Sequence, residues 1–341
     1  MRTTSYAVDT QQAAAAVESV RRLAVEVREA VAPAVVGQQQ VIDDLLAGLL
    51  CGGHCLLEGV PGLAKTLIAK SLAAATELRF GRIQFTPDIL PADILGSDVL
   101  VDDPGGRRRL EFLPGPVFHN VVLADEINRA PPKTQAALLE AMQEGQVTVG
   151  GQRHPLPDPF CVLATRNPIE QEGTYPLPEG QLDRFLMLVR VDYPTQADEV
   201  ELVRRTTGPD LEGVQPAISR QALLAARRTV RLIPIAAPVL EQAVNLVRST
   251  RPGDPVAPAW AEQLISYGGG PRAAQSLVLV AKAFAAVAGR SCVGFADLQR
   301  AAPPVLRHRL IPSLTAIADG ITTDSLIDRL LAERFGKGGM S

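Results

Sequence analysis

The chain has 341 residues, of which 46% are hydrophobic and 21% are charged. This length is about two to three times the commonest domain size, so it predicts more than one packed unit, and the composition excludes wholesale disorder. The 34 basic and 37 acidic residues give a net charge of -3, which provides no overall attraction to nucleic acid or to an anionic membrane. The 28 glycines and 27 prolines indicate many turns of defined shape.

The cysteines and the N-terminus bear on the compartment. The four cysteines are Cys51, Cys55, Cys161 and Cys292. They are too sparse for a disulfide scaffold and favour a reducing, cytoplasmic setting. Cys51 and Cys55 flank His54 without the rest of a metal-ligand set, so small buried thiols are the better interpretation. Asp9 and Gln11 occupy the place where a secretion signal needs apolar residues, and no apolar run reaches the length of a membrane span.

The N-terminal half predicts helices around a parallel sheet. Apolar residues recur at helical spacing over 17–31 and again over 40–50. A short apolar strand at 54–58 then runs into a glycine-rich turn and an Ala-rich helix at 66–76. Further apolar strands are predicted at 121–124 and 160–165, so the order of strand, turn and helix recurs. This order is typical of an α/β domain.

The character of the sequence changes after Pro194. Helical patterns punctuated by Pro and Gly occupy 196–207, 219–230, 236–249, 258–267, 272–288, 295–306 and 323–334. Residues 231–235 are the one further candidate strand. The C-terminal third is therefore predicted to be a smaller, all-α unit.

The segment 59–66 reads Gly-Val-Pro-Gly-Leu-Ala-Lys-Thr and lies between the predicted strand and helix. Such a loop cradles phosphates with its N–H groups, while Lys65 neutralises the outer phosphates and the Thr66 hydroxyl binds Mg²⁺. The strict pattern has Gly directly before the lysine, where this chain has Ala64. A methyl group can be accommodated at the entry to a helix. The alternative, a glycine turn with a surface lysine, does not explain the strand and helix on either side.

Two acids follow the apolar strand at 121–124. The carboxyl edge of a parallel sheet is where ligands bind, so Asp125 and Glu126 are expected beside the phosphate loop. Asp125 would hold Mg²⁺ through water, and Glu126 would polarise the attacking water. Alone, the pair would more often be solvated acids at a strand end.

Asn167 follows the strand predicted at 160–165 and should reach the same edge. Its amide is suited to positioning the water or the terminal phosphate. An Asn before Pro168 is by itself usually only a turn former, so the functional interpretation depends on the strand before it.

These features occur in the order found in AAA+ ATPases, and residues 124–144, 172–179 and 181–185 resemble the MoxR family in particular. The resemblance extends from about Val35 to Leu331, and the phosphate loop with Ala64 is similar to that of the family. It implies a P-loop NTPase fold with a helical lid, ATP and Mg²⁺ as cofactors, and a ring of subunits, commonly a hexamer.

The resemblance also implies roles for individual residues. The phosphate-binding set is Gly59, Val60, Pro61, Gly62, Leu63, Ala64, Lys65, Thr66 and Leu67; Asp125 and Glu126 form the Walker B pair; Asn167 is sensor 1; Arg184 is the arginine finger; Arg272 is sensor 2; and Val36, Gly37 and Gln38 lie against adenine. Guanidinium groups suit such positions because they stay charged and offer bidentate donors to phosphate. Arg129 and Arg166 are rivals of Arg184, since both are expected near the subunit seam.

Two hairpin insertions fit the same family, one over 94–114 and one that begins at 146–149. The predicted domains are an N-terminal helical segment (1–32), a nucleotide-binding α/β domain with both insertions (33–208), a helical lid (209–335) and a disordered tail (336–341). Arg107, Arg108 and Arg109 in the first hairpin could touch nucleic acid or an acidic partner, although so short a basic run is usually a solvated loop.

The leading hypothesis is an Mg²⁺-dependent ATPase that remodels or matures a partner protein. The resemblance implies a chaperone-like activity, often together with a von Willebrand factor A domain protein. A nucleic-acid motor is one alternative, but the acidic pI near 5.9 and the 4% aromatic content count against it. A scaffold that binds ATP without hydrolysis is another, and Glu126 argues against it.

Overall fold

The computed structural model describes residues 10–102, 108–168, 173–208 and 213–336. The chain divides into two compact units, one of residues 27–220 and one in which residues 1–26 join residues 221–341. The turn expected at 103–106, the residue Arg107 and the tail from residue 337 lie outside the described residues. The four-part division of the sequence remains a prediction.

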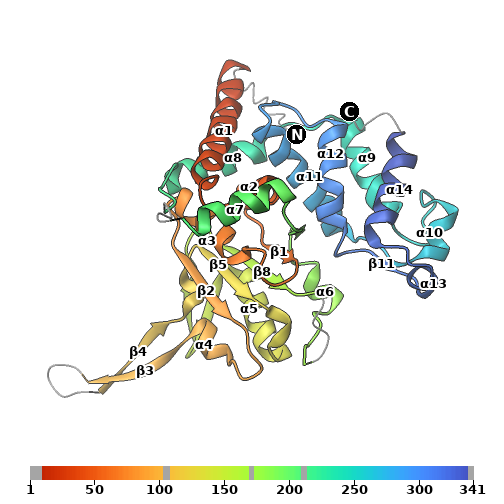
Figure 1. Cartoon of the computed structure of the whole chain (residues 1–341). Coiled ribbons are helices and arrows are strands. Elements are labelled where there is room, and N and C mark those ends of the chain that lie inside the picture. Colours follow the sequence, from red (N-terminus) through yellow and green to blue (C-terminus); the bar gives the residue numbers. More distant parts are fainter. Residues whose placement is uncertain (1–9, 103–107, 169–172, 209–212, 337–341) are drawn as a thin grey trace, which may run out of the picture. The chain divides into compact units, whose positions relative to one another are not determined.

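A five-stranded parallel sheet forms the core of the unit 27–220 (Figure 1). In order across the sheet, its strands are β2 (Phe80–Gln84), β5 (Val121–Asp125), β8 (Cys161–Arg166), β1 (Cys55–Glu58) and β9 (Met187–Arg190). The three inner strands are the predicted ones, and the two edge strands are additions to the prediction. Because all five strands run in the same direction, their carboxyl ends meet at one edge.

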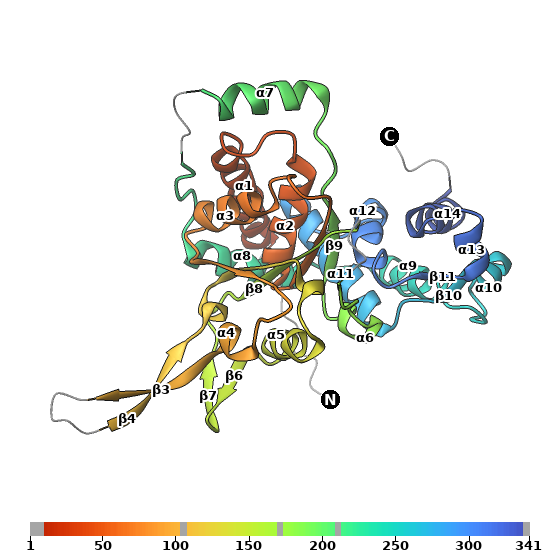
Figure 2. The ribbon, with the colours of Figure 1, turned by 60° about the horizontal axis from the view of Figure 1, so that its bottom comes forward.

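Helices cover both faces of this sheet (Figure 2). On one face, Val122 and Ala124 of β5 belong to the same core as Leu138 and Leu139 of α5 (Pro132–Glu144), which packs beside α4 (Pro91–Leu95). On the other face, α2 (Gln39–Cys51) contacts β9, and α3 (Lys65–Ala75) contacts β2 and β5. The alternation of side chains along each strand supplies apolar groups to both layers.

Both predicted hairpins are confirmed. β3 (Gly96–Asp102) pairs with β4 (Arg108–Pro114), and β6 (Gln146–Val149) pairs with β7 (Gln152–Pro155). Figure 2 shows the first hairpin extending away from the sheet. The turn of the second hairpin needs two residues at positive φ, which Gly150 (φ 56°) and Gly151 (φ 79°) supply.

Shorter elements complete this unit. They are the 3₁₀ turns Pro116–Phe118 and Ile127–Arg129 and the helices α6 (Glu179–Leu182) and α7 (Gln196–Thr206). The N-terminal helix α1 (Thr10–Val31) belongs to the other unit up to Glu26 and to this unit from Val27. It begins before the predicted start at residue 17, because Ala13 to Ala16 continue the helix toward the N-terminus.

The other unit is mainly helical, as predicted. Its helices are α8 (Arg220–Leu232), α9 (Ala237–Arg248), α10 (Ala259–Leu264), α11 (Pro271–Val287), α12 (Phe295–Leu306), α13 (Leu314–Ala318) and α14 (Thr323–Phe335). The expectation of an all-α unit was wrong in one detail, because β10 (Ile265–Tyr267) and β11 (Ile311–Pro312) form a small antiparallel sheet. The candidate strand at 231–235 contributes only a single bridge, between Ile235 and Val293.

None of the described helices is long and apolar enough to cross a membrane.

Candidate active site

The loop between β1 and α3 has the backbone that its sequence predicts. Gly62 has φ +88°, which glycine adopts at little cost. A Cβ on Gly59 would lie 2.5 Å from the carbonyl oxygen of Val191, so this glycine gives room for the chain after β9. Ala64 precedes the first residue of α3 and has φ 55°. The left-handed conformation explains why glycine is the usual residue there, and Ala64 adopts it despite its methyl group.

Lys65 is the first residue of α3, and its ammonium group is bound within the loop. Its Nζ donates hydrogen bonds to the carbonyl oxygens of Gly59 (2.5 Å) and Val60 (2.9 Å). Burial lowers the pKa of Lys65 below its ordinary value, and the charges of Asp125 and Glu126 act in the opposite direction. The lysine is therefore electrostatically coupled to both acids.

Asp125 and Glu126 leave the end of β5 together, and the neighbouring strand β8 fixes their backbone. The Thr165 hydroxyl donates to Asp125 Oδ1 (2.7 Å) and accepts from the backbone N–H of Glu126 (2.8 Å). Glu126 itself has φ 58°, so the chain turns sharply after Asp125. The side chains of Asp125 and Glu126 therefore leave the backbone in different directions. Thr165 is only 1% exposed, and sequence reasoning counted it as part of a strand rather than as part of the site.

The edge strand β2 supplies further partners for these acids. Arg82 donates from Nη2 to Asp125 Oδ2 at 2.7 Å, and Gln84 donates from Nε2 to Glu126 Oε2 at 3.0 Å. Arg129 lies 3.2 Å from the same oxygen of Glu126. Sequence reasoning missed Arg82 and Gln84 because it missed β2. The alternation Arg82, Ile83, Gln84, Phe85 was the signal that could have found them.

A pocket of about 340 Å³ joins these groups. Its lining includes Pro61, Gly62, Leu63, Ala64, Lys65, Thr66, Asp125, Glu126 and Asn167 from the predicted set, and Arg82, Thr165 and Arg166 in addition. The phosphate loop, the acid pair and the polar residue after β8 therefore share one cavity at the carboxyl edge of the sheet. Asn167 is 8% exposed.

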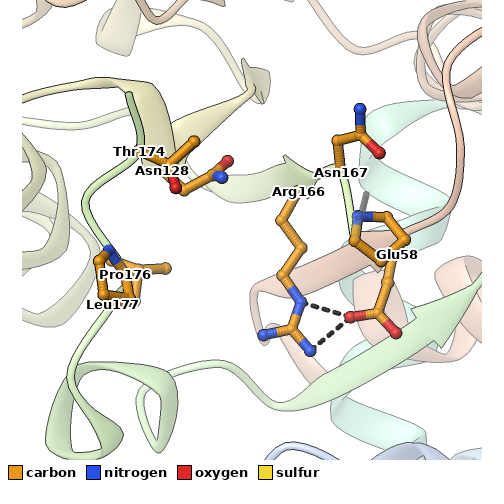
Figure 3. Close-up of a pocket in the computed structure, with 8 residues that line it drawn as sticks. Glu58, Asn128, Arg166, Asn167, Thr174, Pro176 and Leu177 are labelled. Carbon is orange, nitrogen blue, oxygen red and sulfur yellow. Dashed lines mark hydrogen bonds and ion pairs between the residues drawn. The ribbon is translucent and has the colours of Figure 1, made fainter. Parts of the chain in front are cut away.

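A second cavity, of about 480 Å³, adjoins the first and shares Arg166 and Asn167 with it (Figure 3). The Arg166 guanidinium points to Glu58 in Figure 3, and its Nε lies 2.5 Å from Glu58 Oε2. Arg190 of β9 approaches the other oxygen of Glu58 at 3.8 Å. Glu58, Arg166 and Arg190 occupy matching register positions on β1, β8 and β9, so this group, the strand-end clasp, links three neighbouring strand ends.

The remaining predicted residues lie elsewhere. Gly37 has φ +74°, and a Cβ there would collide with Asp198 of α7 at 2.7 Å; beside it, Gln38 donates to the carbonyl oxygen of Asp192. Val36 precedes this pair and is half-buried, Leu67 lies in the first turn of α3, and Arg184 follows α6. Arg272 is the second residue of α11, in the other compact unit.

The oxygen donors in the first pocket fit a hard divalent cation. The Thr66 hydroxyl and the Asp125 carboxylate line the same cavity as Lys65. Mg²⁺ is usually bound through one or two carboxylate or hydroxyl oxygens, substrate phosphates and water, so this set suits a magnesium ion that arrives with a nucleotide.

Comparison with known proteins agrees with this geometry. The family model described as the ATPase family associated with various cellular activities (AAA) matches residues 54–187, and the AAA lid domain model matches residues 258–330. The chain is 42% identical to Chaperone MoxR1 of Mycobacterium tuberculosis over 93% of its own length and 82% of that protein. It is 35% identical to Protein MoxR of Paracoccus denitrificans, over 82% and 86% of the two chains.

A solved structure shows the same architecture. The crystal structure of a proposed ATPase from Cytophaga hutchinsonii superposes with a TM-score of 0.87 at 42% identity, and the match covers 94% of this chain and 97% of that one. The phosphate loop, the acid pair and the lid thus occur in a fold shared with relatives along nearly the whole chain. The chain belongs to the MoxR family of AAA+ ATPases.

Proposed function

We propose that this ATPase binds ATP with Mg²⁺ at the first pocket and hydrolyses it in a ring of subunits, most simply a hexamer, to remodel or mature a partner protein. One observation carries the proposal: Lys65 of the phosphate loop and the acids Asp125 and Glu126 line a single cavity at the carboxyl edge of the sheet. A phosphate chain, a cation and an attacking water all need groups at such an edge.

The loop residues 59–66 bind the phosphates. Lys65 exchanges the carbonyl oxygens of Gly59 and Val60 for phosphate oxygens, which are stronger partners for an ammonium group. Thr66 and Asp125 hold Mg²⁺, and Leu67, in the first turn of α3, ends the nucleotide-binding segment. When bound, the cation would neutralise the charge that develops on the transferred phosphoryl group.

Glu126 orients the attacking water and accepts its proton, and Asn167 positions the water against the terminal phosphate. Both side chains line the pocket. The experiment is Glu126→Gln, which keeps the shape of the side chain and one acceptor oxygen but not its charge or basicity. We expect ATP to bind as in wild type while turnover falls about 100-fold or more.

Glu140→Gln is the matched control, because Glu140 is an exposed acid on α5. Its ATPase rate should equal that of wild type, and EDTA should abolish turnover in both. Wild-type turnover by the Glu126→Gln protein would show that another group activates the water.

We assign Arg184 as the arginine that acts on the neighbouring subunit's nucleotide. Its rivals are engaged within their own chain, Arg129 with Glu126 and Arg166 with Glu58. Among the residues that the structure describes, the half-buried Arg184 side chain has neither an ion pair nor a hydrogen bond. A guanidinium group without such a partner can contact the nucleotide of a neighbouring subunit at little cost in free energy, because no existing contact has to be broken.

Arg184→Ala tests this assignment when it is mixed with wild-type protein at increasing ratios. Because shared sites would lose their arginine, the ATPase activity per wild-type subunit should fall as the variant is added. Arg22→Ala, which removes an exposed arginine from α1, should leave it constant. A constant activity with Arg184→Ala would exclude a role in trans.

Arg272 and the segment Val36, Gly37 and Gln38 complete the proposal as sensor 2 and the adenine contact. The client is proposed to be a protein, with a von Willebrand factor A domain protein as the first candidate. The first hairpin gives little support to a nucleic-acid client, since Arg108 lies 3.5 Å from Asp102 and Arg109 lies 2.8 Å from Glu111. Both charges are balanced by acids of the hairpin itself.

A further inference from the structure

Arg82 makes an unusual contact for an exposed arginine on an edge strand. Its Nη2 and Nε lie 2.7 and 3.2 Å from Oδ2 of Asp125, the carboxylate proposed to hold the metal. The Asp125 side chain is 13% exposed and that of Arg82 is 49% exposed, so the ion pair lies at the rim of the pocket. Both nitrogens share one oxygen of the carboxylate.

The other oxygen of Asp125 is occupied as well, because Oδ1 accepts the hydroxyl hydrogen of Thr165. The carboxylate therefore has a partner on each oxygen before any cation is present. Of the two partners, Thr165 is buried and fixed on β8, whereas Arg82 has a long side chain open to solvent. Oδ2 is the oxygen that can be released at lower cost.

Arg82 also connects the two acids of the site. Its Nη2 donates to Gln84 Oε1 at 2.6 Å, and Gln84 Nε2 donates to Glu126 Oε2 at 3.0 Å. With its carbonyl oxygen turned to Arg82, the Gln84 amide presents its NH₂ group to Glu126. A continuous series of hydrogen bonds thus joins Asp125, Arg82, Gln84 and Glu126.

We propose that Arg82 is the internal counter-ion of Asp125: it competes with Mg²⁺ for this carboxylate, and when it leaves Asp125 it also withdraws the support that turns Gln84 toward Glu126. Arg82 is then a positioning residue whose departure loosens the contact of Gln84 with Glu126 when the metal site fills, whereas Arg129 contacts the same Glu126 oxygen independently of Arg82. This inference rests on the proposed role of Mg²⁺. The proposal differs from a simple surface ion pair in what it predicts. Removing an arginine that only pairs with an acid on the sheet surface would not change the Mg²⁺ concentration needed for nucleotide binding.

The first test measures binding rather than turnover. A fluorescent ADP is bound to the full-length protein while MgCl₂ is titrated, and the Mg²⁺ concentration at half-maximal binding is recorded. Because Arg82→Ala removes the competitor, we expect this concentration to fall about two- to fivefold, the range typical of a partly exposed ion pair. Arg82→Gln lacks the charge but keeps a hydrogen-bond donor, and its Mg²⁺ concentration at half-maximal binding should fall by a similar factor.

Two further variants serve as controls. Arg82→Lys retains a charge and should stay within about twofold of the wild-type midpoint. Arg79→Ala removes another exposed arginine, bound to the carbonyl oxygen of Phe118, and should match wild type. Unfolding with Mg²⁺ alone provides a second measurement, in which the ion should raise the melting temperature of Arg82→Ala more than that of wild type.

A midpoint for Arg82→Ala and Arg82→Gln that equals or exceeds the wild-type value would overturn the competition. Wild-type binding that does not depend on Mg²⁺ would instead refute the proposed binding of Mg²⁺ together with the nucleotide, so the two failures are distinguishable.

The connection to Glu126 has its own test, a double-mutant cycle on kcat at saturating Mg²⁺ and ATP. If Arg82 and Gln84 act through one series of contacts, Arg82→Ala and Gln84→Ala together should change kcat by no more than the larger single change. If the two single changes in kcat multiply in the double variant, Arg82 does not act on Glu126 through Gln84. The competition between Arg82 and Mg²⁺ is tested separately by the Mg²⁺ concentration at half-maximal binding.

Discussion

The phosphate loop and the end of β5 meet in one pocket but are built by different means. Each contains a non-glycine residue in the left-handed region, Ala64 at φ 55° and Glu126 at φ 58°. In the loop, the backbone presents the binding groups, and the side chain of Ala64 has no chemical role. At the end of β5, the side chains do the chemistry, and residues of β2 and β8 hold them.

This difference indicates where each region tolerates change. A loop that works through N–H groups depends on backbone shape and on one charge, that of Lys65. The acid pair depends on hydrogen bonds from neighbouring strands, so it should be sensitive to substitutions that leave its own residues intact. Three substitutions test this contrast, the strongest first.

Lys65→Ala should have the largest effect, because it removes the only charged side chain within the loop 59–66. Losing a charge-assisted contact to phosphate costs about 2–5 kcal/mol, so nucleotide affinity should fall about 100-fold. Binding of a fluorescent nucleotide measures this. Lys70→Ala, one turn further along α3, is the control and should bind normally. Affinity retained by Lys65→Ala would mean that the backbone of the loop suffices.

Thr165→Val should have an intermediate effect, since it deletes the hydroxyl that serves both Asp125 and the N–H of Glu126 while keeping the volume of the side chain. A buried N–H without a partner costs about 1–3 kcal/mol of stability. Denaturant unfolding measures the loss. Thr165→Ser retains the hydroxyl and should recover most of it. Equal losses for Val and Ser would attribute the effect to packing alone.

Ala64→Gly should have the smallest effect, and of the opposite sign. Relief of the left-handed strain is worth about 1 kcal/mol, and the more flexible unfolded chain offsets part of it, so we expect a gain of about 0.5 kcal/mol. Ala73→Gly, within the same helix, should instead lose at least about 1 kcal/mol. Unfolding without nucleotide compares the two. A destabilised Ala64→Gly protein would show that the methyl group contributes packing that outweighs the strain.

The sequence allowed the inner part of the site to be predicted. The strands β1, β5 and β8 are buried on both faces and therefore appear as short apolar runs. The residues at their carboxyl ends, together with the loop 59–66, include most of the predicted groups that line the first pocket. The parallel arrangement alone brings these ends together.

The edge strands escaped prediction for physical reasons. β2 is half-exposed and alternates buried Gly81 and Ile83 with exposed Arg82 and Gln84, so it lacks an apolar run. β9 is a four-residue run, and periodicity cannot separate so short a run from a helix segment. In the other unit, β10 follows α10 without a break, so the helical pattern was extended through it. Arg82, Gln84 and Arg190 were missed with these edges.

The strand-end clasp has a consequence for assembly of the sheet. Glu58 meets Arg166 and Arg190 only because all three occupy equivalent positions in the register of β1, β8 and β9. A slip of one residue would turn an arginine to the opposite face and displace Asn167 from the edge. A chain with the wrong register would lose the clasp and the nucleotide pocket together. Retention of nucleotide can therefore serve as a test of correct strand register, even in variants that no longer hydrolyse ATP.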